Sequence, residues 1–114
     1  MPEVPKALLH RIQEAFLEYR YLLRVHGHER MNQRNIAPLE IREIVLSGEA
    51  IEYDAPGERG IDASVLFSGR VSSGRPLHVK VVEAQNVRSR VRHFVVTVYE
   101  PNIRAWSEDF RFRR

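Results

Sequence analysis

The chain contains no cysteine and, among its 114 residues, only two lysines, Lys6 and Lys80. The absence of cysteine excludes disulfide bonds, zinc sites built on thiolates and cysteine nucleophiles, and it suits a reducing compartment. No uncharged apolar stretch approaches about 18 residues, so no membrane-spanning helix is expected. The N-terminal segment lacks a basic region followed by an apolar run, so a signal peptide is not expected either. Together these absences predict a soluble cytoplasmic protein without a membrane partner.

The composition is ordinary for one globular domain spanning residues 1–114, with 43% hydrophobic and 29% charged residues. The formal net charge is +3 at pH 7, and nearly all of the positive charge is arginine. The planar guanidinium suits phosphate and carboxylate groups, although a codon bias toward arginine produces the same composition. The charge is therefore compatible with a phosphate-bearing partner and does not establish one.

Two helices are expected in the first half of the chain. Apolar residues recur at steps of three, four and one from Leu8 to Leu23, which predicts an amphipathic helix over residues 5–24. A second helix is expected from Pro38 to Leu46, because proline suits the first helical turn and Gly48 a stop. Its expected buried residues are Leu39, Ile41, Ile44 and Val45.

After Gly48 the sequence changes to short segments rich in valine and aromatic residues, separated by turn residues. Four of them predict strands: AIEYD, SVLFSGRV, RPLHVKVVE and RHFVVTVYE. The segment SSG predicts a hairpin between the second and third, and the tail is expected either to form an edge strand or to cover the sheet with Trp106 and Phe110. The order predicts an α+β fold, with N-terminal helices packed on a four-stranded, mainly antiparallel sheet.

Strict alternation along the last two strands sorts their side chains by face. One face carries His78, Lys80 and Val82 of the first of these strands with Val95, Thr97 and Tyr99 of the second. The other face carries Leu77, Val79, Val81, Phe94, Val96 and Val98. A histidine, a fixed cation and a phenol are the groups that metal-free RNA cleavage by a 2′-hydroxyl requires. The same set is also typical of the solvated face of an antiparallel sheet, so both interpretations stay open.

The segment HGHERMNQR holds a second candidate. His26, Arg30 and Arg34 recur at four-residue steps, so on a continuous helix they form one ladder in which the two arginines can clamp a phosphate. A solvated helix end explains the same spacing. Although His26 and His28 are two residues apart, no cysteine or well-spaced acidic partner completes a zinc site. Neither a metal nor a cofactor is predicted.

Five short motifs occur in an order typical of one family. They are H-x-x-x-R-M-x-x-R-x-I from His26, then GEAIEY, LFSGR, RPLHVKV and VVTVYEP…W. Over residues 26–106 the chain resembles the bacterial family catalogued as domain of unknown function 4258. The helix predicted over residues 5–24 lies outside this core. Asn35 stands where glycine is usual and Ala37 where a capping serine or threonine is expected, which are departures of the backbone rather than of the chemistry.

The resemblance implies a toxin of a bacterial toxin–antitoxin pair, similar in size and α+β layout to RelE/ParE- and MqsR-like messenger-RNA interferases. It implies a metal-independent endoribonuclease that acts on RNA, including ribosome-bound messenger RNA, and that a cognate antitoxin protein neutralises. The matched positions His26, Arg30, Arg34, His78 and Tyr99 are the functional candidates that the resemblance implies. With Lys80, which is particular to this sequence, we predict His78, Tyr99, Lys80 and His26 as the catalytic residues. The predicted RNA- and phosphate-binding residues are Arg30, Arg34 and Arg70. Trp106 also matches the family motif, although a core position suits it better.

Two alternatives remain. One is a non-catalytic binding module, such as a ParE-like inhibitor of a topoisomerase. The other is a structural protein that forms a homodimer through the helix predicted over residues 5–24. A similar fold without activity fits the same sequence.

Overall fold

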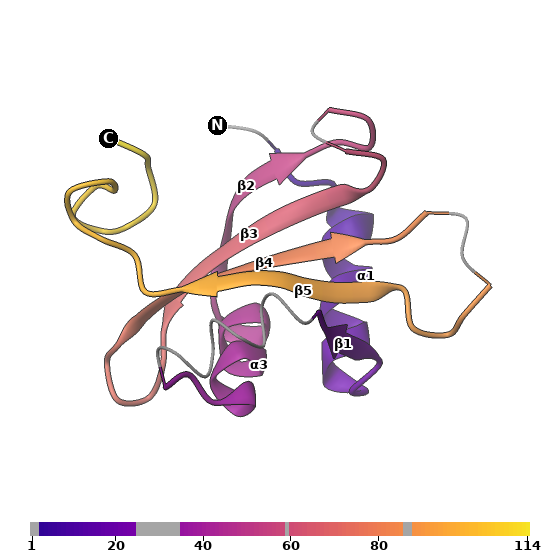
Figure 1. Ribbon diagram of the computed structural model, residues 1–114, viewed down its shortest axis with the longest axis horizontal. Helices are drawn as coiled ribbons and strands as arrows, with labels where there is room; N and C mark the ends of the chain where they lie inside the picture. Colours follow the sequence, from indigo (N-terminus) through magenta and orange to yellow (C-terminus); the bar gives the residue numbers. More distant parts are fainter. Residues whose placement is uncertain (1–2, 25–34, 59, 86–87) are drawn as a thin grey trace.

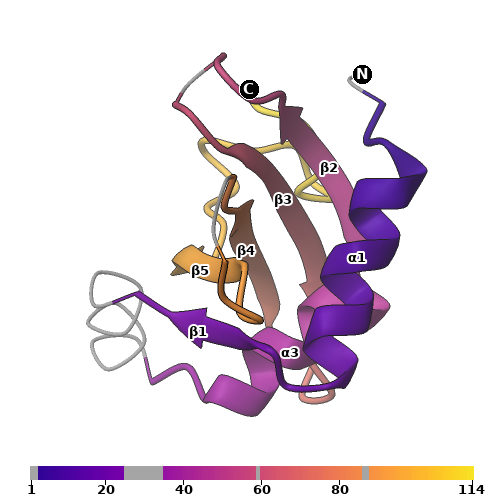
Figure 2. The ribbon, with the colours of Figure 1, turned by 90° about the vertical axis from the view of Figure 1, so that its right-hand side faces the viewer.

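The computed structural model describes residues 3–24, 35–58, 60–85 and 88–114. In these parts of the chain, two helices lie on one face of a five-stranded sheet (Figure 1, Figure 2). The elements, in chain order, are α1 (Lys6–Leu17), β1 (Tyr21–Leu23), α3 (Pro38–Ser47), β2 (Glu49–Asp54), β3 (Ala63–Arg70), β4 (Pro76–Glu83) and β5 (His93–Tyr99). The α+β class is confirmed, whereas the prediction of four strands is wrong because β1 adds a fifth.

The strand order is β1-β5-β4-β3-β2. β1 runs parallel to β5, and the other neighbours are antiparallel. The predicted hairpin between β3 and β4 is confirmed: the Val71 N–H donates to the Arg75 carbonyl oxygen at 3.0 Å, and Gly74 takes the positive φ (93°) that glycine tolerates. The sheet is therefore mainly antiparallel, with one parallel edge made by the first strand.

Helix α1 ends at Leu17, although the apolar spacing predicts a helix as far as residue 24. Tyr19 adopts the left-handed conformation, with φ 57°. The Arg20 N–H bonds the Ala15 carbonyl at 2.7 Å and the Tyr19 N–H bonds the Phe16 carbonyl at 3.3 Å, which is the Schellman pattern of a helix C-terminus. The chain therefore leaves the helix here, and the apolar residues that follow form β1 instead.

Strand β1 is held both by strand β5 and by helix α1. Its three residues pair with residues 93–95 of β5. The Tyr21 ring stacks on the Phe16 ring, with centroids 3.9 Å apart. Over only three positions, the apolar pattern of an edge strand cannot be distinguished from that of an amphipathic helix. The apolar spacing therefore predicted a longer helix than the one that forms.

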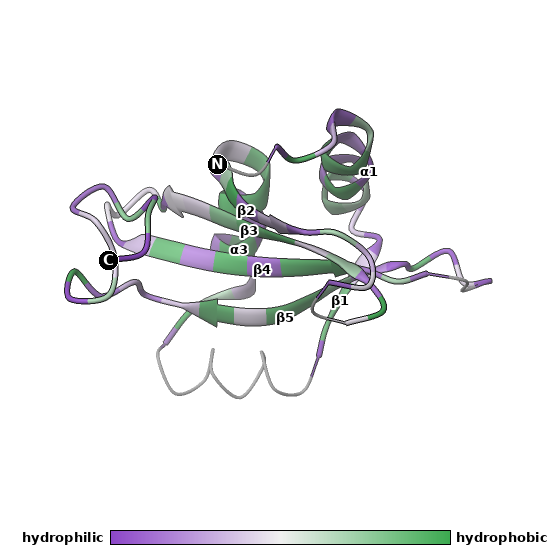
Figure 3. Ribbon diagram, turned by 90° about the horizontal axis from the view of Figure 1, so that it is seen from above, coloured by the Kyte–Doolittle hydropathy of each residue, from purple (hydrophilic) through white to green (hydrophobic). Residues whose placement is uncertain are grey.

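The main core lies between the two helices and the sheet (Figure 3). Helix α1 contributes Leu8, Ile12 and Phe16, while the sheet contributes mostly valines of β3, β4 and β5. The buried face of α1 therefore packs on its own chain. None of the helices in the described parts of the chain is long and apolar enough to cross a membrane.

Helix α3 confirms the predicted start at Pro38 and stop near Gly48. The Glu40 carboxylate accepts the Ala37 N–H at 2.8 Å and closes the helix N-terminus. Arg42 donates from Nε to the Phe16 carbonyl at 2.9 Å, so α3 adds a second hydrogen bond to a carbonyl at the end of α1. Ile41, Ile44 and Val45 are buried as predicted. The prediction for Leu39 is wrong: it lies on the outer face and is 69% exposed.

A β-bulge corrects the predicted faces of β5. Lys80 pairs with Thr97, but the next residue of β4, Val81, pairs with Val95. Val96 is the additional residue, so the alternation of β5 shifts by one. As a result Val95 is fully buried in the main core with Val98, whereas strict alternation placed it on the polar face. Phe94 is half-buried rather than in that core.

The C-terminal tail, residues 100–114, lies on the face of the sheet that the helices leave uncovered (Figure 2). It covers the sheet there, which decides between the two expectations for the tail. Trp106 packs with Ile51 of β2 and Leu66 of β3 in a second, smaller core, with Tyr99 and Phe110 at its margin. The expectation that Trp106 is a core residue is confirmed, since it is 3% exposed.

Candidate functional site

A hollow of about 160 Å³ lies on the helix-free face of the sheet, beside the tail; we call it the central hollow. Four strands and the tail contribute to it. It is lined by Glu52, Asp54, Ser64, Leu66, Lys80, Thr97, Tyr99 and Arg113. The bulges of β2 and β5 both face this side and increase the local twist of their strands. The hollow therefore gathers two cations, two carboxylates and three hydroxyl groups.

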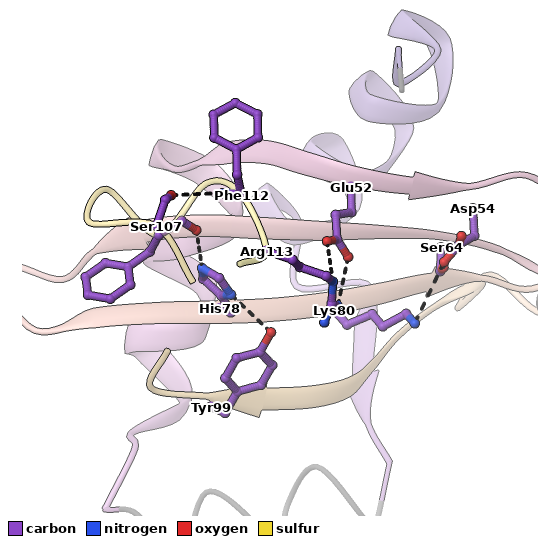
Figure 4. A network of polar contacts seen from close by, with 10 residues as sticks. Glu52, Asp54, Ser64, His78, Lys80, Tyr99, Ser107, Phe112 and Arg113 are labelled. Carbon is purple, nitrogen blue, oxygen red and sulfur yellow. Dashed lines mark hydrogen bonds and ion pairs between the residues drawn. The ribbon is translucent and has the colours of Figure 1, made fainter. Parts of the chain in front are cut away.

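His78 lies beneath the tail next to this hollow, and its hydrogen bonds fix its tautomer (Figure 4). Nε2–H donates to the Phe110 carbonyl oxygen at 2.8 Å. The Tyr99 hydroxyl donates to Nδ1 at 3.1 Å. The side chain is 0% exposed, and burial lowers the pKa of His78 from 6.5 to about 4 against the opposing effect of the Phe110 carbonyl. The imidazole is therefore neutral at physiological pH and orients the Tyr99 hydroxyl.

Tyr99 stays protonated at neutral pH. Burial raises the pKa of its phenol above the ordinary value, although Arg113 acts in the opposite direction. The ring is half-buried and its edge faces the His78 ring, with centroids 5.2 Å apart. The single phenol proton points to His78 Nδ1, so the hydroxyl donates a proton or a hydrogen bond to a ligand in the hollow only when its O–H turns away from that nitrogen.

Each cation of the hollow lies near a carboxylate (Figure 4). Arg113 forms a bidentate pair with Glu52, with distances of 2.7 and 3.0 Å. Its guanidinium carbon also lies 4.6 Å from the centre of the Trp106 ring. Lys80 Nζ lies 4.0 Å from Asp54 Oδ2, which is at the limit of an ion pair. The Glu52–Arg113 pair is thus held by two hydrogen bonds, whereas Lys80 has only a long contact with its carboxylate in the hollow.

The predicted site residues are divided by the structure. It brings together His78, Lys80, Thr97 and Tyr99 on one face, as the alternation predicts. Arg70 lies at the end of β3, where it donates to the Gly74 carbonyl at 2.8 Å and faces the Phe110 ring, outside the central hollow. His26, Arg30 and Arg34 lie outside the described residues, so their ladder stays a prediction.

Sequence reasoning missed Glu52 and Arg113. Glu52 belongs to AIEYD, where the bulge at Ile51 places both Ile51 and Glu52 toward the tail. Arg113 lies 61 residues further along the chain and reaches the hollow because the tail folds back. Asp54 and Ser64, which are hydrogen-bonded at 3.3 Å, were missed as well. The available signal was strand alternation, which places Glu52 and Asp54 of β2 on one face together with Ser64 and Leu66 of β3.

A second polar cluster, on the helix side of the sheet, ties α1 to β4 and β5. Arg11 makes a bidentate pair with Glu83 at 2.9 and 3.0 Å, and His93 Nε2 lies 3.0 Å from the same carboxylate. Burial lowers the pKa of His93. For Glu83, burial acts to raise the pKa, but the hydrogen bonds from Arg11 and His93 outweigh it and lower the pKa. We interpret this cluster as a support for α1.

No group of three histidine, cysteine or acidic side chains suited to a metal ion occurs in the described parts of the chain. The two carboxylates of the central hollow are each engaged by a cation or a hydroxyl. The chemistry that the hollow can perform therefore depends on its own lysine, arginine, carboxylate and phenol.

Residues 23–100 match the family described as Domain of unknown function (DUF4258). The chain belongs to this family. The predicted membership is confirmed, with a match that begins three residues earlier than predicted and ends before Trp106. Comparisons with curated proteins and with solved structures found no significant match. In this DUF4258 chain, Glu52, Lys80 and Tyr99 lie within the matched residues, whereas α1, Trp106 and Arg113 lie outside them.

Proposed function

We propose that this DUF4258 protein is a metal-independent endoribonuclease that acts as the toxin of a toxin–antitoxin pair. One observation carries the proposal: the Tyr99 hydroxyl, the Lys80 ammonium and the Glu52–Arg113 pair line the same hollow on the open face of the sheet. Two helices on one face of a mainly antiparallel sheet also support the likeness to RelE/ParE-type toxins. RNA is the proposed substrate, and a cognate antitoxin is the proposed protein partner.

The proposed reaction is a transesterification within the RNA. The 2′-hydroxyl attacks the neighbouring phosphorus and gives its proton to the Glu52 carboxylate, which Arg113 holds in place. The bond from phosphorus to the 5′-oxygen breaks, and Tyr99, whose O–H turns from His78 Nδ1 toward that oxygen, gives its proton to it. The products are a 2′,3′-cyclic phosphate and a 5′-hydroxyl. Lys80 and Arg113 stabilise the negative charge that develops on the phosphoryl oxygens.

The structure refines the role that the sequence suggests for His78. A buried, neutral imidazole with both nitrogens hydrogen-bonded does not reach a substrate in this conformation. We therefore propose His78 as a positioning residue for Tyr99, and Tyr99, Glu52 and Lys80 as the groups that contact RNA.

The test is RNA cleavage by the full chain in EDTA, with the chemical identity of the new ends determined. We expect 2′,3′-cyclic phosphate ends, and a rate lower by about a hundredfold or more in Tyr99→Phe and in Lys80→Met. Lys6→Met is a matched control, because Lys6 is the other lysine and is exposed at the start of α1. Tyr19→Phe is the control for the phenol, since Tyr19 is 62% exposed and lies on the helix side.

Cleavage at an unchanged rate in both Tyr99→Phe and Lys80→Met would remove the central hollow as the active site. A non-catalytic binding module is the second proposal, and the ion pairs that already neutralise both cations of the hollow favour it. That proposal predicts growth inhibition on induction of the gene without new RNA ends. Both measurements on the same induced culture separate the two.

A further inference from the structure

A second hollow lies on the same face of the sheet, at the other side of Lys80; we call it the outer hollow. Its volume is about 260 Å³. It is lined by Arg24, Gly60, Ile61, Asp62, Ser64, Lys80, Val82 and Val96. Ser64 and Lys80 also line the central hollow, so the two form one groove with Lys80 at their junction. A ligand that occupies both places its charged part at Lys80.

The outer hollow has apolar surfaces suited to a flat ring. Val82 of β4 and the bulge residue Val96 of β5 are half-buried, and Ile61 beside them is 80% exposed. A nucleobase has two apolar faces and a polar edge, and proteins bind such rings between apolar or aromatic side chains. These side chains therefore offer an apolar wall to such a ring.

Arg24 adds a stacking surface next to this wall. Its guanidinium carbon lies 4.9 Å from the centre of the Phe94 ring. A guanidinium that lies over an aromatic ring presents its other face to a base, and stacking of this kind tolerates every base. Arg24 therefore supports binding of a base without selecting which one.

Asp62 can distinguish one base from another. The Gln85 N–H donates to Asp62 Oδ1 at 2.9 Å, which holds the carboxylate in place. Each carboxylate oxygen accepts more than one hydrogen bond, so both oxygens can accept from a ligand. Guanine presents two adjacent N–H donors, on N1 and N2, to such a carboxylate. Adenine, cytosine and uracil each present one donor group beside an acceptor, which an ionised carboxylate does not satisfy.

We propose that the outer hollow binds the guanine base of the RNA nucleotide whose 3′-phosphate lies at Lys80. The inference rests on the proposed function in taking RNA as the ligand. It adds a base subsite on Arg24, Asp62 and Val82 and a preference for cleavage after guanine. None of these three residues takes part in the proposed transesterification.

The experiment titrates the full chain with guanosine 3′-monophosphate and with the three other nucleoside 3′-monophosphates. Nuclear magnetic resonance follows the backbone amides of residues 60–62, 82 and 96. We expect the guanosine nucleotide to bind most tightly and to shift these amides. Asp62→Asn should reduce the preference over adenosine by about tenfold, because the substituted amide replaces one acceptor by donors. Val82→Trp should fill the hollow and abolish binding of all four.

Glu14→Gln is the matched control, since Glu14 is exposed and pairs with His10 on the surface of α1, and this variant should bind the nucleotide like the unchanged protein. Asp62→Asn keeps the test valid if Val82→Trp fails to fold. Equal affinity for the four nucleotides, or a guanine preference that survives Asp62→Asn, would overturn the inference. RNA cleavage without base preference would overturn it and leave the nuclease intact. Guanosine nucleotide binding in the outer hollow without RNA cleavage would support the subsite and reject the nuclease.

Discussion

His78 shows how surroundings decide the chemistry of a single side chain. The sequence places a histidine on a polar sheet face, where it is an obvious proton carrier. In the folded chain the Trp106 ring lies against it, with centroids 4.4 Å apart, and the Phe110 carbonyl occupies Nε2. The residue is consequently a neutral hydrogen-bond acceptor for Tyr99 rather than a free base.

This assignment has a measurable pH dependence. An unfolded chain protonates the imidazole below pH 6.5, whereas the folded chain keeps it neutral down to about 4. Between these values the unfolded state binds more protons, so the free energy of unfolding should fall as the pH is lowered. The lowered pKa of His93 acts in the same direction.

Nuclear magnetic resonance of the imidazole nitrogens measures the tautomer and the pKa of His78. For His78 we expect the Nε2–H tautomer and a titration near pH 4, and the pH dependence of unfolding should become shallower in His78→Phe. Free histidine in the same buffer is the reference. An Nδ1–H tautomer, or a titration of His78 near 6.5, would show that the tail does not bury the ring in solution.

At the scale of elements, Gly48 at the junction between α3 and β2 has the closest backbone neighbours among the glycines that the structure describes. A Cβ atom on Gly48 would lie 2.4 Å from the Ile44 carbonyl oxygen and 2.7 Å from that of Ser68. Both neighbours are backbone atoms, which cannot rotate away. Only glycine allows α3 to end directly against β3.

Gly48→Ala should therefore lower the free energy of unfolding by about 2–3 kcal/mol through overpacking. Urea unfolding followed by circular dichroism measures it. Gly60→Ala is the matched control, because a Cβ there meets nothing within 4 Å. A difference of less than about 0.5 kcal/mol between the two variants would contradict the close packing.

At the scale of the whole molecule, the sheet separates two cores of unequal size. The main core joins both helices to the sheet, whereas the smaller one holds the tail through three buried residues, Ile51, Leu66 and Trp106. Trp106 is the only tryptophan of the chain, so its fluorescence reports on the tail alone. Local regions with few buried contacts open at lower free energy than the rest.

The tail should thus detach before the domain unfolds. In urea, we expect the midpoint of the Trp106 fluorescence transition to lie below that of the far-ultraviolet circular dichroism transition. Arg113→Gln, which removes the bidentate pair with Glu52, should lower the fluorescence midpoint further and leave the other in place. Coincident transitions in the unchanged protein would indicate one cooperative unit.

The elements that the sequence predicted well are those with a strong local pattern. Helix α3 follows from Pro38 and Gly48, and four of the five strands follow from short segments of β-branched and aromatic residues bounded by turn residues. The end of α1 was missed because Tyr19 takes a conformation that usually requires glycine. The shift in β5 was missed because a bulge leaves no clear composition signal.

The candidate site was predicted in part for the same reason. Lys80 and Tyr99 lie close together in the pairing of two neighbouring strands, so alternation alone brings them to one face. Glu52 and Arg113 meet only after the tail folds over the sheet, and no local pattern encodes that contact. Long-range placement of a tail depends on packing of Trp106, which the sequence identifies as a core residue without naming its neighbours.

The pairing of β1 with β5 has a consequence for how the protein is made. Residues 21–23 are synthesised well before the strand that receives them, which spans residues 93–99. A nascent chain that has not yet reached β5 therefore has no partner for its first strand, and contacts so distant in sequence form slowly. The same strand supplies Tyr99, so the proposed active site is completed only after β5 has been synthesised.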